Sequence, residues 1–273
     1  MKIKKPLKIK FSIAYNTAYN QKIIKNVSAS PLPIYVLSVK TFTDRINHIQ
    51  QEMAKHNLAF EFIFDHDVYD IDETTDERYF SVNSTLSPAA KSITLKHITA
   101  WQKAQLHNYE QILVLEDDIV LAPKFLQKLE KILTSARNLP PGYLIFLGGA
   151  DTKVPKEFFK SQSDFYKLSI PTAEAYITDI AAVKARIAWL NENKIFLPAD
   201  HAMVKIDHDC SISQYWPKKS IVTQGSVWGL FKTTLDTSRR KKSAFTNRVL
   251  FEWKKFTRRT LPQTSYNIIN FFK

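Results

Sequence analysis

The chain has 273 residues, of which 44% are hydrophobic, which suits one large globular domain or two small ones and excludes extensive disorder. Its formal net charge is +13, and its one cysteine, Cys210, excludes an intrachain disulfide framework and favours a reducing compartment. The sequence contains no run of 18 apolar residues, and the apolar stretch at residues 11–14 is too short for a signal peptide, so we expect a cytoplasmic protein.

The positive charge lies at the two ends of the chain. Residues 1–26 contain seven lysines and no acidic residue, and residues 232–273 contain eleven basic residues against Asp236 and Glu252. The stretch between them is close to neutral, which argues against a nucleic-acid-binding core and favours terminal segments that meet an anionic surface. We therefore expect three parts: a basic leader over residues 1–30, a globular domain over residues 31–231 and a basic amphipathic tail over residues 232–273.

The first predicted elements form a strand–helix–strand unit. Residues 34–37 are a short apolar run of β-prone residues, which is typical of a buried strand. Residues 45–56 carry apolar side chains at helical spacing, and residues 60–64 alternate into a second strand. A strand, a helix and a strand within about 35 residues predict a βαβ unit with a parallel sheet.

Helices and strands continue to alternate along the chain. Ser87 and Pro88 predict the N-cap and the first turn of a helix that runs through Ala104. Apolar patterns then predict strands over residues 111–115, 143–147 and 175–178, and helices over residues 123–133 and 181–189. The predicted fold class is therefore α/β, with a mainly parallel sheet flanked by helices.

Three consecutive carboxylates, Glu116, Asp117 and Asp118, follow the buried strand that ends at Leu115. Adjacent negative charges repel one another, and half-burying them costs several kcal/mol unless a cation is present. In a strand, Glu116 and Asp118 would share one face, which predicts a two-carboxylate clamp for a hard divalent metal that also bridges to phosphate oxygens. The alternative is a solvated acidic turn.

The tail has its own pattern. Phe245, Val249, Leu250, Trp253 and Phe256 recur at helical spacing, and basic residues cover the other face. This arrangement is typical of a helix that lies in a membrane interface. The alternative is a helix packed on the domain with its basic side in solvent.

Six stretches of the chain match, in the same order, the motifs of one protein family. They are residues 34–38 with Arg45, 86–91 with 96–101, 113–119, 172–177, 197–200, and Pro217 with 222–226. On these motifs the chain resembles the glycosyltransferase family 25 proteins, the lipooligosaccharide sugar transferases of Gram-negative bacteria, over roughly residues 33–226. The chain differs from the family pattern at Lys96, where members usually have Ser, at Glu174 and Ala175, where a glycine usually precedes the Tyr, and at residues 89–91.

The resemblance implies a GT-A-like, Rossmann-type domain that binds a nucleotide sugar and transfers the sugar with inversion at the anomeric centre. It implies UDP-galactose as the donor and a lipooligosaccharide or related surface glycan as the acceptor. Charge builds on the leaving diphosphate as the glycosidic bond breaks, and a divalent cation, Mn²⁺ or Mg²⁺, neutralises that charge. Glu116 and Asp118 are the expected metal ligands.

Five residues are expected to bind the nucleotide sugar. Ligands of open α/β sheets bind beyond the carboxyl ends of the strands, where Ser38 and Asp65 should lie. The guanidinium fork of Arg45 suits phosphate or uracil, although a surface arginine at a helix start is the alternative. Asp117 is a candidate for the ribose, and Gln224 is expected to face the same cleft.

An inverting transfer needs a base that takes the proton of the acceptor hydroxyl. Asp200 is the first candidate, because it matches the late Asp of the family, and Glu174 is the second; Asp200 could equally contact the donor sugar. His97 is expected to bind phosphate when protonated or to orient a neighbour, and a structural histidine is the alternative. Asp151, which follows two glycines, is a candidate acceptor contact.

Two other classes of function remain as alternatives. A non-catalytic membrane- or nucleic-acid-binding module would use the basic tail, but the neutral core and the clustered carboxylates disfavour it. A metal-dependent phosphohydrolase would also use paired carboxylates, but the chain lacks a His-rich metal cluster and a phosphate-cradling glycine loop. We expect a transferase on the cytoplasmic face of the inner membrane, with a lipid-linked oligosaccharide acceptor, an anionic membrane surface at its tail and no nucleic-acid partner.

Overall fold

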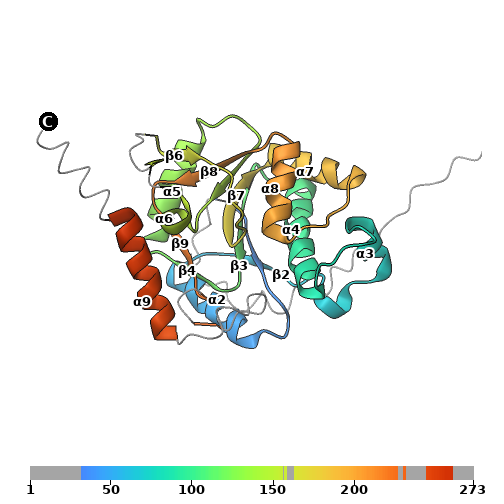
Figure 1. Ribbon diagram of the computed structural model, residues 1–273, viewed down its shortest axis with the longest axis horizontal. Helices are drawn as coiled ribbons and strands as arrows, with labels where there is room; N and C mark the ends of the chain where they lie inside the picture. The colour runs from blue at the N-terminus through green and yellow to red at the C-terminus, as the bar shows by residue number, and fades with distance from the viewer. Residues whose placement is uncertain (1–31, 156, 159–162, 227–229, 232–243, 261–273) are drawn as a thin grey trace, which may run out of the picture.

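The computed structural model describes residues 32–155, 157–158, 163–226, 230–231 and 244–260. Within these residues, a seven-stranded sheet lies between two layers of helices (Figure 1). The basic leader predicted over residues 1–30 lies outside the described residues, as do residues 232–243 and 261–273 of the tail. None of the described helices combines the length and apolar character needed to cross a bilayer.

The sheet is mixed, and its order is β2-β1-β3-β7-β5-β8-β6. The strands β2, β1 and β3 pair in parallel, as do β5 and β8, whereas β7 runs antiparallel to both β3 and β5, and β6 runs antiparallel to β8. The α/β class is confirmed, but the parallel pairs are interrupted by one reversed strand in the centre. The strands are β1 (Ile34–Leu37), β2 (Glu61–Ile63), β3 (Gln111–Glu116), β5 (Tyr143–Phe146), β6 (Phe165–Lys167), β7 (Ala175–Asp179) and β8 (Ser213–Pro217).

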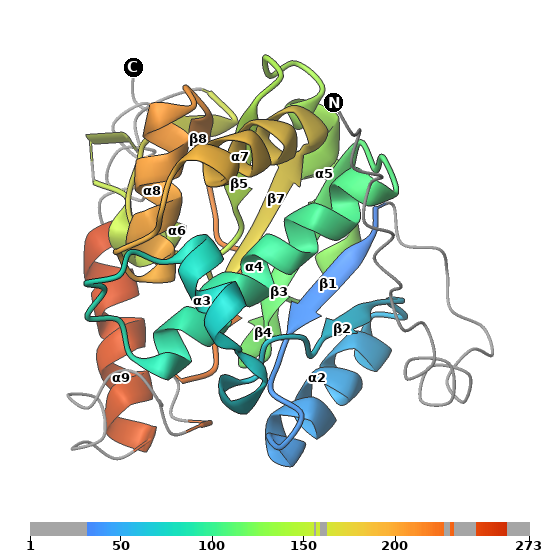
Figure 2. The ribbon, with the colours of Figure 1, turned by 90° about the vertical axis from the view of Figure 1, so that its right-hand side faces the viewer.

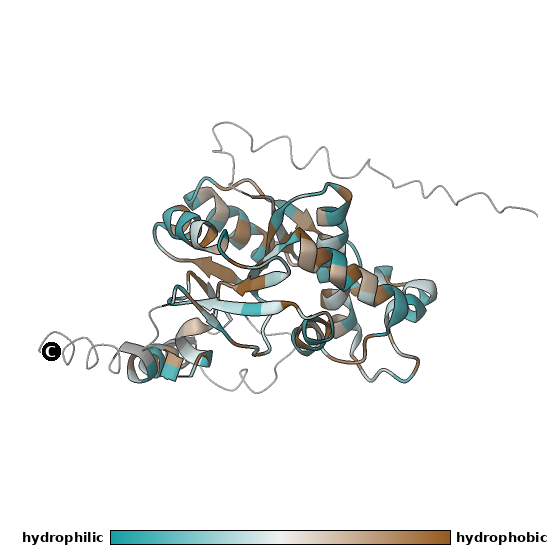
Figure 3. Ribbon diagram, turned by 90° about the horizontal axis from the view of Figure 1, so that it is seen from above, coloured by the Kyte–Doolittle hydropathy of each residue, from teal (hydrophilic) through white to brown (hydrophobic). Residues whose placement is uncertain are grey.

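Helices cover both faces of the sheet (Figure 2). One face packs against α2 (Thr43–Lys55) and α5 (Phe125–Ala136), and the other against α4 (Pro88–Leu106), α7 (Ile180–Glu192) and α8 (Ala199–Asp209). Because neither face meets water, the central strands are apolar on both sides. Figure 3 shows hydrophobic residues, in brown, on ribbons in the interior of the molecule.

The strand β3 shows how the two cores are divided. Its side chains alternate, so Ile112 and Val114 join the core beneath α4 while Leu113 and Leu115 join the core beneath α2 and α5. All four side chains are fully buried. An uninterrupted apolar run therefore gives a central strand, as the sequence predicted.

The predicted helix over residues 88–104 is confirmed together with its cap. The Ser87 hydroxyl accepts from the Ala90 backbone N–H at 3.2 Å, and Pro88 occupies the first turn, where its missing N–H costs nothing. The sequence patterns missed some short or polar elements: η2 (Val68–Asp70), α3 (Glu73–Tyr79), α6 (Ala150–Lys153), β6, β8 and the helix α8.

Two strands lie outside the main sheet. The strand β4 (Ile119–Leu121) pairs antiparallel with β9 (Val222–Gln224), which follows it by about 100 residues. Side chains of α2 hold the other edge of β4: His48 Nε2 lies 2.8 Å from the Ile119 C=O, and Glu52 accepts from the Leu121 N–H at 2.8 Å. The last described elements of the chain are the tail helix α9 (Ala244–Lys255) and η5 (Phe256–Thr260), which follows it directly.

A buried ion pair joins the helices of the α4 face. The Arg186 guanidinium donates to both carboxylate oxygens of Asp207 at 2.7 and 3.0 Å, and to the Thr178 hydroxyl at 2.8 Å. It also lies 4.9 Å from the Trp101 ring centroid. Arg186 and Asp207 are both buried, so each charge depends on the other for its compensation.

Asp207→Ala is expected to lower the free energy of unfolding by about 3–5 kcal/mol, because it leaves the Arg186 charge buried without its partner. Urea unfolding followed by circular dichroism measures the change. The matched control is Lys205→Ala, which removes an exposed ion pair with Asp209 from the same helix and should shift the midpoint little. Equal midpoints for the two variants would contradict this account of the pair.

Candidate active site

Four strand ends meet at one edge of the sheet. The carboxyl ends of β1, β3 and β5 lie there, and the reversed strand β7 brings its amino end to the same edge. Leu37 pairs with Glu116, and the Glu116 backbone N–H donates to the Glu174 C=O at 2.9 Å. The edge predicted from the strand pattern is therefore present, and the antiparallel β7 adds Glu174 to it.

Glu116 and Glu174 lie side by side on one face of the sheet. Val114 and Tyr176, two residues into their strands, both belong to the core beneath α4. Because strand side chains alternate, Glu116 and Glu174 project to that same face. The negative charge of Glu174 is one cause that raises the pKa of Glu116.

Asp118 lies near Glu116 because of a turn in the chain, which the sequence did not predict. The strand β3 ends at Glu116, and Asp117 and Asp118 form a turn before β4, so strand alternation does not place Asp118. The two carboxylates are nevertheless neighbours, since the charge of Asp118 raises the pKa of Glu116. The turn, rather than a shared strand face, makes the pair.

Burial and repulsion both disfavour negative charge in this cluster. Desolvation raises the pKa of Glu116 well above its ordinary value, and the charges of Asp118, Glu174 and Asp117 raise it further, while Arg45 opposes them. Desolvation also raises the pKa of Asp118, against the opposing effects of Arg45 and of a hydrogen bond with Ser226. Asp118 is 3% exposed, and its Oδ1 has no hydrogen-bond partner among the described residues.

The Asp117 carboxylate accepts hydrogen bonds from two of the residues predicted to bind the nucleotide sugar. The Arg45 guanidinium donates to its Oδ1 at 2.7 Å, and the Ser38 hydroxyl donates to its Oδ2 at 2.8 Å. Arg45 also lies over the rings of Phe42 and Phe231, at 5.3 and 5.5 Å from their centroids. The structure thus brings Ser38, Arg45 and Asp117 together, with Asp117 as their common acceptor.

The segment after β9 closes one side of the cluster. The Gly225 N–H donates to the Asp118 C=O at 2.5 Å, and a Cβ atom at Gly225 would lie 2.7 Å from that oxygen, so only glycine fits. Gln224 pairs with Ile119, directly after Asp118, and is half-buried. The backbone of Gln224 therefore lies beside the acidic turn, its predicted place in the cleft stays a prediction, and the Ser226 contact was missed.

Two glycines make room for the Glu174 carboxylate. A Cβ atom at Gly148 would lie 2.7 Å from Glu174 Oε1, and Gly149, at φ +73°, lies close to it as well. The Thr172 hydroxyl donates to the other carboxylate oxygen, Oε2. Of the two predicted bases, Glu174 is the one that the structure places beside Glu116 and Asp118.

Asp200 and Asp151 lie on helices near the rim. Asp200 follows α7 and sits in the first turn of α8, half-exposed, where it accepts from the His201 N–H at 2.9 Å. Asp151 is the second residue of α6, which begins directly after Gly149, and its side chain is outside what the structure describes. Neither position tests the assigned role.

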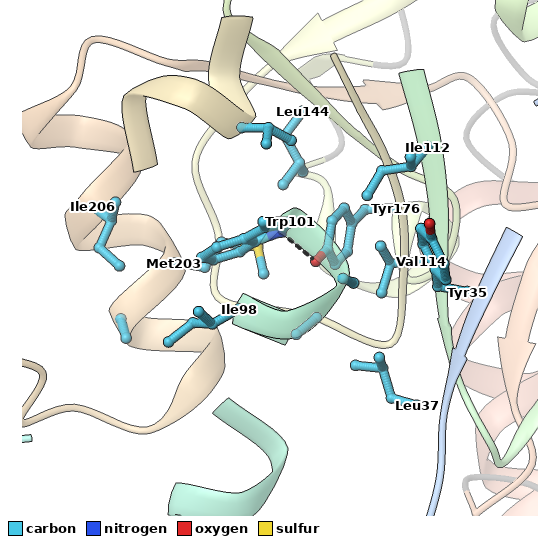
Figure 4. Close-up of a cluster of buried hydrophobic side chains, with 14 of the residues drawn as sticks. Tyr35, Leu37, Ile98, Trp101, Ile112, Val114, Leu144, Tyr176, Met203 and Ile206 are labelled. Carbon is cyan, nitrogen blue, oxygen red and sulfur yellow. Dashed lines mark hydrogen bonds between the residues drawn. The ribbon is translucent and has the colours of Figure 1, made fainter. Parts of the chain in front are cut away.

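His97 lies in the core rather than at the rim. Its Nδ1 is 3.0 Å from the Tyr176 hydroxyl, which also accepts from Trp101 Nε1 at 2.9 Å (Figure 4). Burial, aided by the charge of Arg186, lowers the pKa of His97 to about 3, so the imidazole is neutral at physiological pH. The expected protonated, phosphate-binding form is not supported, whereas the contact with Tyr176 fits both other expectations, a histidine that orients a neighbour and a structural one.

The loop after β2 carries a buried carboxylate, but it is not Asp65. The Asp65 side chain is exposed, and its backbone C=O accepts from Lys96 Nζ at 2.8 Å. Lys96 also pairs with the buried Asp67 at 2.7 Å, and Asp67 accepts from the Lys40 N–H at 3.0 Å. In the sequence, only the departure from the family pattern at Lys96 could have indicated the Lys96–Asp67 ion pair. Through the hydrogen bond from Lys40, this ion pair fixes the loop that follows β1.

A divalent metal ion fits the donor set of Glu116 and Asp118. Both offer hard oxygen ligands, both are disfavoured as free anions, and Asp118 has an unpaired buried oxygen. Across the described ranges, no three His, Cys, Asp or Glu side chains converge as a ready-made cage. A pair of this kind suits Mg²⁺ or Mn²⁺, because Mg²⁺ commonly takes one or two carboxylates and completes its shell with water and phosphate oxygens.

Comparison with known proteins identifies a family that the chain matches. Residues 32–197 match the model of glycosyltransferase family 25, described as an LPS biosynthesis protein. A Haemophilus influenzae protein named "Putative glycosyltransferase" is 37% identical over 102 residues, which are 35% of this chain and 36% of that protein. The match thus spans about a third of that relative's length.

Solved structures offer more distant likenesses. A glycosyltransferase involved in the glycosylation of the major capsid of PBCV-1 is 12% identical, covers 80% of this chain and 99% of its own, and has a TM-score of 0.36. Mouse xyloside xylosyltransferase 1 is 13% identical, covers 64% of this chain and 68% of its own, and has a TM-score of 0.35. The family model, in contrast, spans more than half of the chain and includes its carboxylate cluster. The chain belongs to glycosyltransferase family 25.

Proposed function

We propose that the protein transfers a sugar from a nucleoside diphosphate sugar to a glycan hydroxyl. The observation that carries the proposal is the crowding of Glu116, Asp118 and Glu174 at one sheet edge, where burial and repulsion raise the pKa values of the first two. Such a site favours a bound cation, and a cation there would favour a diphosphate. Membership of family 25 supports the same reaction class.

Glu116 and Asp118 would hold the metal ion, Mn²⁺ or Mg²⁺. When bound, the ion would supply positive charge that offsets the charge of the leaving diphosphate. Arg45 stays charged and lies beside this group, so it adds a fixed positive potential toward the same ligand. Ser38, Asp117, Asp65 and Gln224 remain the proposed contacts of the nucleotide sugar.

Glu174 is the proposed base of an inverting transfer. Its carboxylate would take the proton of the acceptor hydroxyl while the hydroxyl oxygen bonds to the anomeric carbon and the diphosphate leaves with the electron pair of the broken bond. Thr172 donates to one Glu174 oxygen, which fixes the side chain and leaves the other oxygen beside Gly148. Asp200 is the second candidate for the base, and Asp151 is the proposed acceptor contact.

The donor and acceptor follow from the resemblance to lipooligosaccharide transferases. We propose galactose from UDP-galactose as the transferred sugar and a lipid-linked oligosaccharide as the acceptor, on the cytoplasmic face of the inner membrane. The basic tail over residues 232–273 supports this location, because its charge favours an anionic membrane surface. Cleavage of the donor to UMP and galactose 1-phosphate, in place of UDP and galactose, would instead favour a metal-dependent phosphohydrolase.

Asp118→Asn is expected to lower Mn²⁺-dependent turnover of UDP-galactose at least about 100-fold, because it removes a charged ligand of the ion. The variant should also lose the rise in melting temperature that Mn²⁺ with UDP gives the wild-type protein. Asp209→Asn, which alters an exposed carboxylate on α8, is the matched control and should keep both properties. Unchanged turnover in Asp118→Asn would refute the assigned role of this residue.

The raised pKa values give the metal-free protein a defined pH dependence. Above about pH 4 the unfolded chain releases carboxyl protons that Glu116 and Asp118 still hold in the folded state, so their contribution to stability falls as pH rises through the folded-state pKa values. Glu116→Gln has no such proton to lose. Its stability relative to the wild type should therefore increase from about pH 5 to about pH 8 in urea unfolding with a chelator. A constant difference across this range would contradict the assigned electrostatics.

Glu174→Gln is expected to lower kcat for sugar transfer by about 10²–10⁴-fold while UDP binding in the presence of Mn²⁺ changes little, because the change removes a base but keeps the shape. Transfer assays and calorimetry separate the two effects. Asp200→Asn is the competing variant. Loss of transfer in Asp200→Asn, with Glu174→Gln active, would assign the base to Asp200.

A further inference from the structure

The tail helix α9 presents its apolar side to solvent. Its exposed apolar residues are Val249, Leu250 and Trp253, with exposed fractions of 49%, 46% and 64%, and Phe256, the first residue of η5 directly after it, is 42% exposed. At 100° per residue these four side chains share one face, and Trp253 and Phe256 are in ring contact at 6.2 Å between centroids. We call these four residues the outward face of α9.

The opposite side of the helix faces the domain. Phe251, about half a turn around the helix from Trp253, is half-buried, and α9 and η5 pack against α6. A helix that only covered the domain would bury its larger apolar face and leave its basic side in water. Here Val249, Trp253 and Phe256 point outward instead, so packing on the domain does not account for them.

The charge around the outward face favours one kind of partner. Residues 244–260 contain five basic residues, Arg248, Lys254, Lys255, Arg258 and Arg259, against the single acid Glu252. This charge repels a second copy of the same helix, and it attracts anionic lipid headgroups. Exposed Trp and Phe beside Lys and Arg are the composition of helices that lie in a bilayer interface, where the basic side chains reach the headgroups.

We propose that the outward face of α9 docks the protein on an anionic lipid bilayer, with Trp253 and Phe256 inserted between the headgroups. The proposal adds a docking surface to the proposed lipid-linked acceptor, and it has its own geometric support. The helix packs on α6, which begins directly after Gly149, next to the Glu174 carboxylate (Figure 1). Docking through α9 would therefore hold this rim of the candidate site close to the membrane surface.

Co-sedimentation of the full chain with vesicles tests the proposal. The wild-type protein is expected to bind vesicles of phosphatidylcholine with one-third phosphatidylglycerol, and to bind pure phosphatidylcholine or any vesicle at high salt much more weakly. The double variant Trp253→Ser/Phe256→Ser should lower binding to the anionic vesicles by about tenfold or more. Lys254→Gln/Lys255→Gln should weaken binding and reduce its salt dependence.

Leu106→Ser is the matched control, because Leu106 is 74% exposed on α4 and precedes β3 at the opposite edge of the sheet. It should bind the anionic vesicles as the wild type does, and all variants should keep the wild-type melting temperature. Unchanged binding in the serine double variant would overturn the proposal. So would a wild-type dimer in analytical ultracentrifugation that becomes a monomer in that variant, since the face would then belong to a second copy. These measurements do not depend on donor turnover. A negative result would therefore contradict membrane docking but not the proposed transferase activity.

Discussion

Mutual repulsion among carboxylates at one sheet edge is the constraint around which this part of the molecule is built. Burial raises the pKa values of Glu116 and Asp118, the negative charges of Asp117 and Glu174 raise them further, and the positive charge of Arg45 opposes the rise. Arg45 forms an ion pair with Asp117 at 2.7 Å, while burial disfavours the charged forms of Glu116 and Asp118. Close backbone approaches at Gly148 and Gly225 let these acids come together at all. Burying neighbouring carboxylates in this way lowers the stability of the fold, and it suits a site that binds a cation and a diphosphate.

Much of the fold was predictable because its strands are buried on both sides. Short apolar runs gave β1, β3, β5 and β7, and the Ser87–Pro88 pair gave the start of α4. The order of the strands was not predictable, since the reversal of β7 depends on how long connections pack. The helix α8 was missed although Ala202, Met203 and Ile206 have helical spacing, because polar residues separate them. The strands β4 and β9 were too short for any periodic pattern, and only tertiary pairing reveals them.

The candidate site was likewise predictable in part. Ser38, Arg45 and Asp117 were selected from motifs, and the structure brings them into one hydrogen-bonded group. Glu174 could be named from the sequence, but its place beside Glu116 comes from strand register, which no local pattern encodes. His97 was overrated because a buried imidazole bonded to Tyr176 and a phosphate-binding one look alike in a sequence. The strand argument for Asp118 was wrong in its geometry, since the chain turns after Glu116.

The contact between Gly225 and Asp118 joins parts of the chain that are synthesised far apart. Residues 116–118 leave the ribosome about 100 residues before residues 222–226, which supply the Ser226 hydroxyl and the partner strand of β4. At typical synthesis rates of 5–20 residues per second, that delay is on the order of ten seconds. During this interval the acidic turn has neither its strand partner nor its Ser226 hydrogen bond. A nascent chain therefore completes the proposed metal site only after residues 222–226 have been synthesised.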